Sequence, residues 1–292
     1  MTSRSGTPVT ALLADLNRVL AAVTPDPPDS ATAVQERNSF VREESVRTLD
    51  AHAQLLLHSA GENLEALDRL VIAGDLAIAP WVIARASLEA SAHVVWILER
   101  KVSVKQRVGR SLALRYESLR AQERLASSEK NVRLLTRIRD RIDEVEKVAQ
   151  ELGFQRLRDH RGRINGIAVR KPSNTDLVTE VLCSANIYRI LSGVAHSDTV
   201  TLSQLAFAPA GSADRHGLIK VATPARSVLK LLVPNVAAAY SRAVWEAILR
   251  YGADAADAAV VLEKRFDELD LRDDNRTRFW RTKLTVGDRE HG

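Results

Sequence analysis

One short stretch of the chain combines residue types that can hold a phosphate group and move a proton. It runs from residue 188 to residue 198 and reads YRILSGVAHSD. On a helix, residues three, four and seven positions apart lie on one face, so Arg189, Ser192 and His196 would form a polar stripe, with Tyr188 beside it. Arginine binds phosphate through parallel N–H groups, and histidine exchanges protons near neutral pH. The stretch therefore predicts either a site of anion recognition and proton transfer or a set of polar packing contacts.

A second polar stripe is predicted in the helix expected at about 80–100. Arg85, Glu89 and His93 are spaced four residues apart and would share one face, while nearly all of their neighbours are apolar. A buried polar group without a partner costs about 1–3 kcal/mol. We therefore expect the second stripe to be paired with other groups and to support the first one.

The second stripe also bears on metal binding. Glu89 and His93 are four residues apart, whereas the helices of di-iron bundles use a spacing of three. Further ligands would have to come from His52, His58 or His196. The chain has a single cysteine, which excludes a disulfide framework and a thiolate cluster. We expect no metal and no other cofactor.

Positive charge is concentrated between residues 99 and 171. This part holds 20 Lys and Arg against 10 Asp and Glu, whereas the net charge of the whole chain is +5. Such an asymmetry suits a polyanion such as RNA or DNA. The alternative is that an arginine-rich composition covers solvated helix faces, since the chain has 33 Arg and 9 Lys. The residues expected to contact nucleic acid are Arg156, Arg158, Arg161, Arg163, Arg170 and Lys171.

Apolar residues recur at intervals of three and four over most of the chain, which predicts an all-α protein. The predicted helices span residues 9–23, 39–73, 80–100, 104–128, 129–152, 176–196, 223–251 and 254–269. The charged pair at 104–128 and 129–152 carries a heptad seam, so we expect an antiparallel helical hairpin that protrudes from a multi-helix bundle. Alternation of polar and apolar residues predicts a small β-hairpin insertion at about 199–222.

Three parts of the chain are expected from this pattern. Residues 1–38 form a short helix and a Pro-rich linker, 39–252 form the bundle core, and 253–292 form a C-terminal helix and a basic tail. No run of about 18 apolar residues occurs, so we expect a cytoplasmic protein without a membrane partner.

The segments RASLEA at 85–90 and YRILSGVAH at 188–196 resemble a group of bacterial helical proteins that are similar to the HEPN superfamily (higher eukaryotes and prokaryotes nucleotide-binding domains). The resemblance covers roughly residues 40–252. It implies a helical bundle that forms a homodimer, binds RNA, and acts as a metal-independent endoribonuclease of a stress or defence system. An antitoxin-like or other defence-system partner is implied as well.

The HEPN active motif is an arginine followed, after four to six residues, by a histidine, and Arg189 and His196 match it with six residues between them. The resemblance implies that His196 takes the proton of the RNA 2′-hydroxyl group and that Arg189 stabilises the phosphorane. The alternative is a non-catalytic interaction or scaffold protein, in which both polar stripes only stabilise the bundle. An open basic cleft around Arg189 and His196 would favour the enzyme, and packing of both against Arg85 and Glu89 would favour the scaffold.

Overall fold

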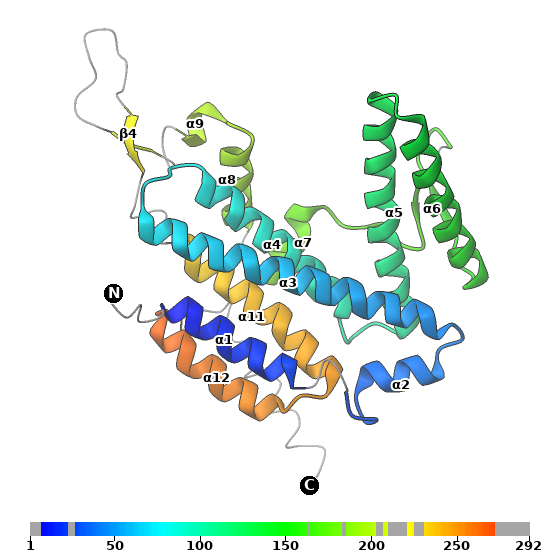
Figure 1. Cartoon of the computed structure of the whole chain (residues 1–292), viewed down its shortest axis with the longest axis horizontal. Helices are drawn as coiled ribbons and strands as arrows, with labels where there is room; N and C mark the ends of the chain where they lie inside the picture. The colour runs from blue at the N-terminus through cyan, green and yellow to red at the C-terminus, as the bar shows by residue number, and fades with distance from the viewer. Residues whose placement is uncertain are drawn as a thin grey trace.

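The computed structural model of the chain describes residues 7–22, 27–162, 164–182, 185–202, 207–209, 221–224 and 231–271. Within these residues the fold is an all-α bundle with two small β-hairpins, as the hydrophobic pattern predicts (Figure 1). The helices are α1 (Pro8–Ala21), α2 (Thr32–Ser39), α3 (Glu43–Ala73), α4 (Ala79–Leu98), α5 (Val104–Ser128), α6 (Val132–Glu151), α7 (Asn174–Leu182), α8 (Ala185–Ala195), α9 (Thr199–Thr201), α11 (Leu232–Tyr251) and α12 (Ala255–Glu268). The strands are β1 (Arg156–Arg158), β2 (Ile164–Ile167), β3 (Phe207–Pro209) and β4 (Val221–Pro224).

Helices α3, α4 and α11 form the centre of the bundle. In α3, Leu49, Ala53, Leu64 and Leu67 are fully buried, which confirms the apolar face predicted from their spacing. The helix ends at Gly74, which adopts the left-handed conformation that terminates many helices (φ 67°).

Helix α4 is surrounded by other helices on most of its circumference. It packs against α3, α11, α7 and α8. By length and composition it is apolar enough to cross a membrane, but 67% of its most apolar 18-residue stretch is buried inside the protein. Burial in the bundle therefore accounts for its apolar composition.

Helices α1 and α12 lie side by side on the outside of α11 (Figure 1). Leu12 and Leu16 of α1 and Leu262 and Phe266 of α12 are fully buried in the same hydrophobic core as the central helices. The segments that flank residues 39–252 thus contribute to one common core.

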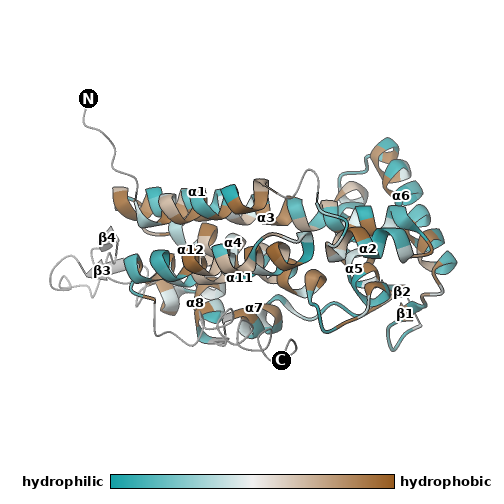
Figure 2. Cartoon of the chain, turned by 90° about the horizontal axis from the view of Figure 1, so that it is seen from below, coloured by the Kyte–Doolittle hydropathy of each residue, from teal (hydrophilic) through white to brown (hydrophobic). Residues whose placement is uncertain are grey.

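Helices α5 and α6 form an antiparallel hairpin that extends away from the bundle (Figure 1). Ile138, Ile142, Val145 and Ala149 are buried in a second hydrophobic cluster between the two helices, which confirms the predicted heptad seam. In Figure 2 α6 carries both hydrophilic and hydrophobic residues, as expected for an amphipathic helix. The hairpin is therefore an outgrowth with its own small core.

Several predicted boundaries were wrong. Residues 154–172, which fall between the helices predicted at 129–152 and 176–196, contain the antiparallel pair β1–β2. The helix expected to begin at residue 39 begins at Glu43, and the linker part of residues 1–38 contains most of a further helix, α2. The helix expected at 176–196 begins earlier, at Asn174; the structure describes it as α7 and α8, and residues 183 and 184 lie outside the described residues.

The β-hairpin insertion is present, but it is displaced from its predicted start. Strand β3 pairs antiparallel with β4. Residues 199–201, predicted as strand, are the short helix α9, because the side chain of Asp198 accepts a hydrogen bond from the Thr201 amide and caps the turn (2.8 Å). Thr223 and Pro224, predicted to begin a helix, lie in β4, and that helix begins at Leu232.

Candidate functional site

The two predicted polar stripes meet where α4 packs against α8. Arg85 Nε lies 2.8 Å from Glu89 Oε1, and the Tyr188 hydroxyl donates a hydrogen bond to the same oxygen at 2.5 Å. The Arg85 guanidinium lies over the Tyr188 ring in a cation–π contact, with 5.5 Å between Cζ and the ring centre. Its Nη1 atom lies 3.1 Å from His196 Nε2. We refer to Arg85, Glu89, Tyr188 and His196 as the α4–α8 cluster.

The C-terminal end of α8 fixes the position of His196. The His196 amide donates to the Ser192 carbonyl (2.9 Å), and the Asp198 amide donates back to the Gly193 carbonyl (2.9 Å). Ser197 between them has a left-handed backbone (φ 58°), which completes a Schellman-type helix end. Gly193 lies inside α8 and lets α9 approach, because a Cβ atom there would lie only 2.7 Å from Thr201 Oγ1. His196 therefore directly follows α8, and these contacts fix the backbone at that end of the helix.

The cluster holds one ionised carboxylate beside one neutral phenol. Burial by itself would raise the pKa of Glu89, but the hydrogen bonds from Tyr188 and Arg85 outweigh it and leave the pKa below its ordinary value. Burial and the bond to Glu89 raise the pKa of Tyr188. Arg85 can only donate hydrogen bonds, so His196 Nε2 acts as the acceptor in this contact and the ring proton is assigned to Nδ1.

The members of the cluster differ in exposure. The side chains of Arg85 and Glu89 are 22% and 24% exposed, whereas His196 lies on the surface. Arg189 is also exposed and has no hydrogen bond or ion pair to the part of the chain that the structure describes. Ser192, half-buried, contributes its carbonyl to the helix end. The side chain that contacts His196 is thus Arg85, and not the Arg189 of the sequence motif.

His93 continues the α4 stripe away from His196. Asn174, the first residue of α7, lies near both Glu89 and His93. Lys171 Nζ donates to Asn174 Oδ1 at 2.9 Å. Burial, and next the charge of Lys171, lower the pKa of His93 to about 4, so its imidazole is neutral at pH 7.

The predicted nucleic-acid-binding residues do not all face solvent in the same way. Arg156 pairs with Glu146 at the root of the hairpin (2.5 Å), and Lys171 turns inward with a side chain only 15% exposed. Arg158 donates to the Gly162 carbonyl (2.6 Å). Four of the predicted residues, Arg156, Arg158, Arg161 and Arg170, are exposed; Arg163 lies outside the described residues.

A cavity of about 560 Å³ opens where the α5–α6 hairpin joins the bundle. We call it the junction cavity. Its lining comes from α3, α4, α5, α6 and the start of α7 with the residues before it. Of the lining residues, only His93 and Lys171 were predicted from the sequence as site residues. The polar residues around it are His52, His93, Arg115, Glu117, Ser118, Gln122, Arg141, Lys171 and Asn174. No local sequence signal joins them, because they come from five separate segments.

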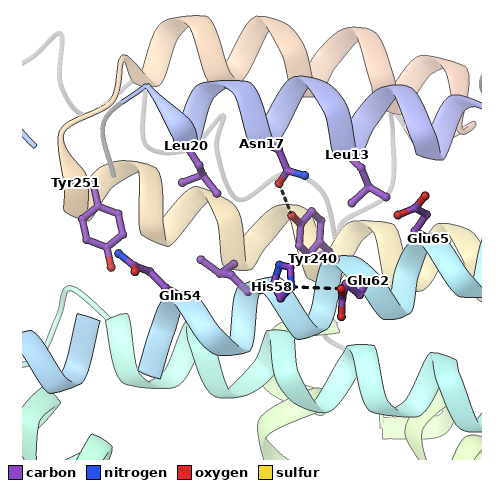
Figure 3. Close-up of a pocket in the computed structure, with 11 residues that line it drawn as sticks. Leu13, Asn17, Leu20, Gln54, His58, Glu62, Glu65, Tyr240 and Tyr251 are labelled. Atoms are coloured by element: carbon purple, nitrogen blue, oxygen red, sulfur yellow. Dashed lines mark hydrogen bonds and ion pairs between the residues drawn. The ribbon is translucent and has the colours of Figure 1, made fainter. Parts of the chain in front are cut away.

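A second cavity, of about 370 Å³, lies between α1, α3 and α11 (Figure 3). Tyr240 donates a hydrogen bond to Asn17 Oδ1 (3.1 Å), and His58 lies 3.3 Å from Glu62 at the opening. Burial raises the pKa of the Tyr240 hydroxyl well above its ordinary value. Tyr240 packs closely against Gly61, where a Cβ atom would lie only 3.2 Å from the Tyr240 hydroxyl oxygen.

Potential metal ligands do not converge in the described part of the chain, where no group of three or more His, Cys, Asp or Glu side chains could hold an ion. Comparison of the chain with protein-family models, with curated proteins and with solved structures finds no match.

Proposed function

We propose that the chain is an RNA-binding protein that cleaves RNA at the α4–α8 cluster without a metal ion. The observation that supports this most is the contact between Arg85 and His196, which places a permanent cation 3.1 Å from a potential proton acceptor at an exposed position. Metal-free cleavage needs these two groups side by side: a base for the 2′-hydroxyl proton and a cation for the phosphorane.

In the proposed reaction the scissile phosphate binds Arg85, which releases the lone pair of His196 Nε2. His196 takes the proton of the 2′-hydroxyl group, and the 2′-oxygen forms a bond to phosphorus. The bond from phosphorus to the 5′-oxygen breaks, and that oxygen receives a proton from the imidazolium or from water. The products are a 2′,3′-cyclic phosphate and a 5′-hydroxyl end.

The other members of the cluster position these groups. Glu89 and Tyr188 hold the guanidinium of Arg85 from the buried side. Arg189 is exposed on the same helix as His196 and is free to bind a neighbouring phosphate. The exposed arginines of the β1–β2 segment extend the RNA-binding surface. The proposal includes a cytoplasmic homodimer in a stress or defence system with an antitoxin-like partner, as the HEPN resemblance implies.

A scaffold role is the competing proposal, and it is favoured by a specific observation. Arg85, Glu89 and Tyr188 satisfy one another in a half-buried set that joins α4 to α8, which is sufficient reason for their presence in a structural protein. In that case His196 would serve only as a surface neighbour of Arg85.

Cleavage of a fluorescent single-stranded RNA, measured with the melting temperature of each variant, distinguishes the two proposals. His196→Ala should lower the cleavage rate about 10²–10⁴-fold with little change in melting temperature, because the side chain is exposed. Arg85→Ala should lower both, because it leaves half-buried Glu89 without its cation. Cleavage should persist in EDTA.

His58→Ala is the matched control, because His58 is also an exposed histidine but lies on α3 beside Glu62. It should leave cleavage unchanged. A parent protein that cleaves no RNA, combined with early melting of Arg85→Ala, would reject the nuclease in favour of the scaffold.

A further inference from the structure

The junction cavity combines positive charge with an apolar wall. Its volume of about 560 Å³ lies within the range of small-molecule sites, about 300–1,000 Å³. It is built by two parts of the fold, since the bundle supplies α3 and α4 and the hairpin supplies α5 and α6.

Three cations line the cavity against one carboxylate. Lys171 lies 3.5 Å from Glu117, whose side chain is 57% exposed, and Arg115 lies 3.3 Å from exposed Glu144. Arg141 has no ion-pair partner in the described ranges of the chain. The lining therefore carries an excess of positive charge. The carboxylates that pair with Lys171 and Arg115 are exposed, and such surface ion pairs are weak.

The two histidines of the cavity add polar groups without adding charge. His52 Nδ1 is 2.7 Å from Ser111 Oγ, and burial is the main reason that the pKa of each imidazole is lowered. The Nε2 atom of His93 is buried and has no hydrogen-bond partner within the described residues. A buried polar atom of this kind is expected to find a partner when a ligand binds.

The remaining wall is aliphatic. Leu55 lines the cavity and is 67% exposed. Leu56, Leu114 and Leu119 line the same cavity. An inorganic anion would leave this wall in contact with water, whereas a molecule with an apolar body would cover it.

We infer that the junction cavity binds a small organic anion, with its anionic head group at Lys171 and Arg141 and its apolar body against Leu55 and its neighbours. This inference does not depend on the proposed nuclease function, because none of these residues belongs to the α4–α8 cluster.

Two dyes with the same ring system provide the test on the full-length protein. 8-Anilinonaphthalene-1-sulfonate carries an anionic sulfonate, and N-phenyl-1-naphthylamine lacks it. Fluorescence titration should give one saturable site for the anionic dye and weaker binding of the neutral dye. The double variant Arg141→Gln/Lys171→Gln should weaken binding of the anionic dye about tenfold or more, since it removes two charge-assisted contacts, and should leave the neutral dye unaffected.

Two further variants make the result specific. Arg137→Gln removes an exposed arginine one turn from Arg141 on α6, outside the cavity lining, and should change nothing. Leu55→Ser should weaken both dyes equally. Because Arg141 is exposed, the single variant Arg141→Gln tests the head-group position even if the double variant does not fold. Equal affinity for the two dyes, or an unchanged affinity of Arg141→Gln for the anionic dye, would overturn the inference.

Discussion

His93 lies on α4 at the edge of the junction cavity, with Lys171 and Asn174 on one side and Glu89 one turn away. Its pKa is about 4 in the folded protein, against about 6.5 in an unfolded chain. Above pH 6.5 the imidazole is neutral in both states. As the pH falls from 6.5 to about 4, the unfolded chain binds a proton that the folded protein rejects, so the free energy of unfolding decreases.

This residue should therefore make the protein acid-sensitive. The contribution of His93 to the loss of stability between pH 6.5 and 4 should be about 3 kcal/mol, and urea unfolding at a series of pH values would measure it. His93→Gln keeps a neutral polar side chain and should flatten the pH dependence in this window. Some dependence should remain from His52, whose pKa burial also lowers. An identical pH profile for His93→Gln and the parent would contradict this explanation.

At the scale of elements, a buried ionic network joins helices that are distant in sequence. Arg250 of α11 donates to Asp50 of α3 (2.6 Å) and to Glu36 of α2 (2.8 Å), and Arg107 of α5 also pairs with Glu36. Arg107 further donates to the Val102 carbonyl (2.7 Å). Arg250 and Arg107 are 2% and 5% exposed. The network thus holds α2 and the start of the α5–α6 hairpin against the bundle.

Breaking this network should cost far more than breaking a surface pair. Arg250→Met leaves Asp50 and Glu36 without their shared cation and should lower the free energy of unfolding by about 3–5 kcal/mol. The control is Arg47→Met, which removes a surface i,i+4 pair with Glu43 and should cost less than about 1 kcal/mol. Chemical denaturation measures both, and similar costs for the two variants would show that the network is not a main tie between these helices.

At the scale of the whole molecule, charge is divided between the two parts of the fold. Residues 99–171, which include the hairpin and the β1–β2 segment, carry an excess of ten positive charges, while the rest of the chain is net negative. Exposed arginines release counterions from a polyanion when they bind it, so RNA affinity should fall steeply with salt.

Charge reversal can locate this surface. Arg158→Glu, Arg161→Glu and Arg170→Glu together should weaken RNA binding and reduce its salt dependence without changing the melting temperature, because all three side chains are exposed. Reversal of Arg18 and Arg69, which are exposed on the bundle, is the control and should have little effect. Binding that is independent of salt would mean that the arginines only cover solvated helix faces.

The sequence by itself determined most of the long helices and much of the faces that they bury. The spacing of apolar residues in α3 and α6 predicted most of the buried positions, because helical periodicity is a local property of the chain. The periodicity of short segments was misleading. Residues 199–201 alternate between polar and apolar like a strand, but the Asp198 cap stabilises a turn of helix there. The polar stripes on α4 and near His196 could also be predicted, because polar residues at helical spacing are easily recognised in an otherwise apolar segment of sequence.

Only the tertiary structure decided which of these side chains meet. His196 contacts Arg85, which lies 111 residues away, because α8 packs against α4, whereas Arg189 points to solvent although it is close in sequence. The buried network joins Glu36 to Arg250 over 214 residues. The junction cavity exists because a hairpin with its own core stands beside a bundle. Contacts of this kind depend on how helices pack against each other, and helix packing is not encoded in the periodicity of any single segment.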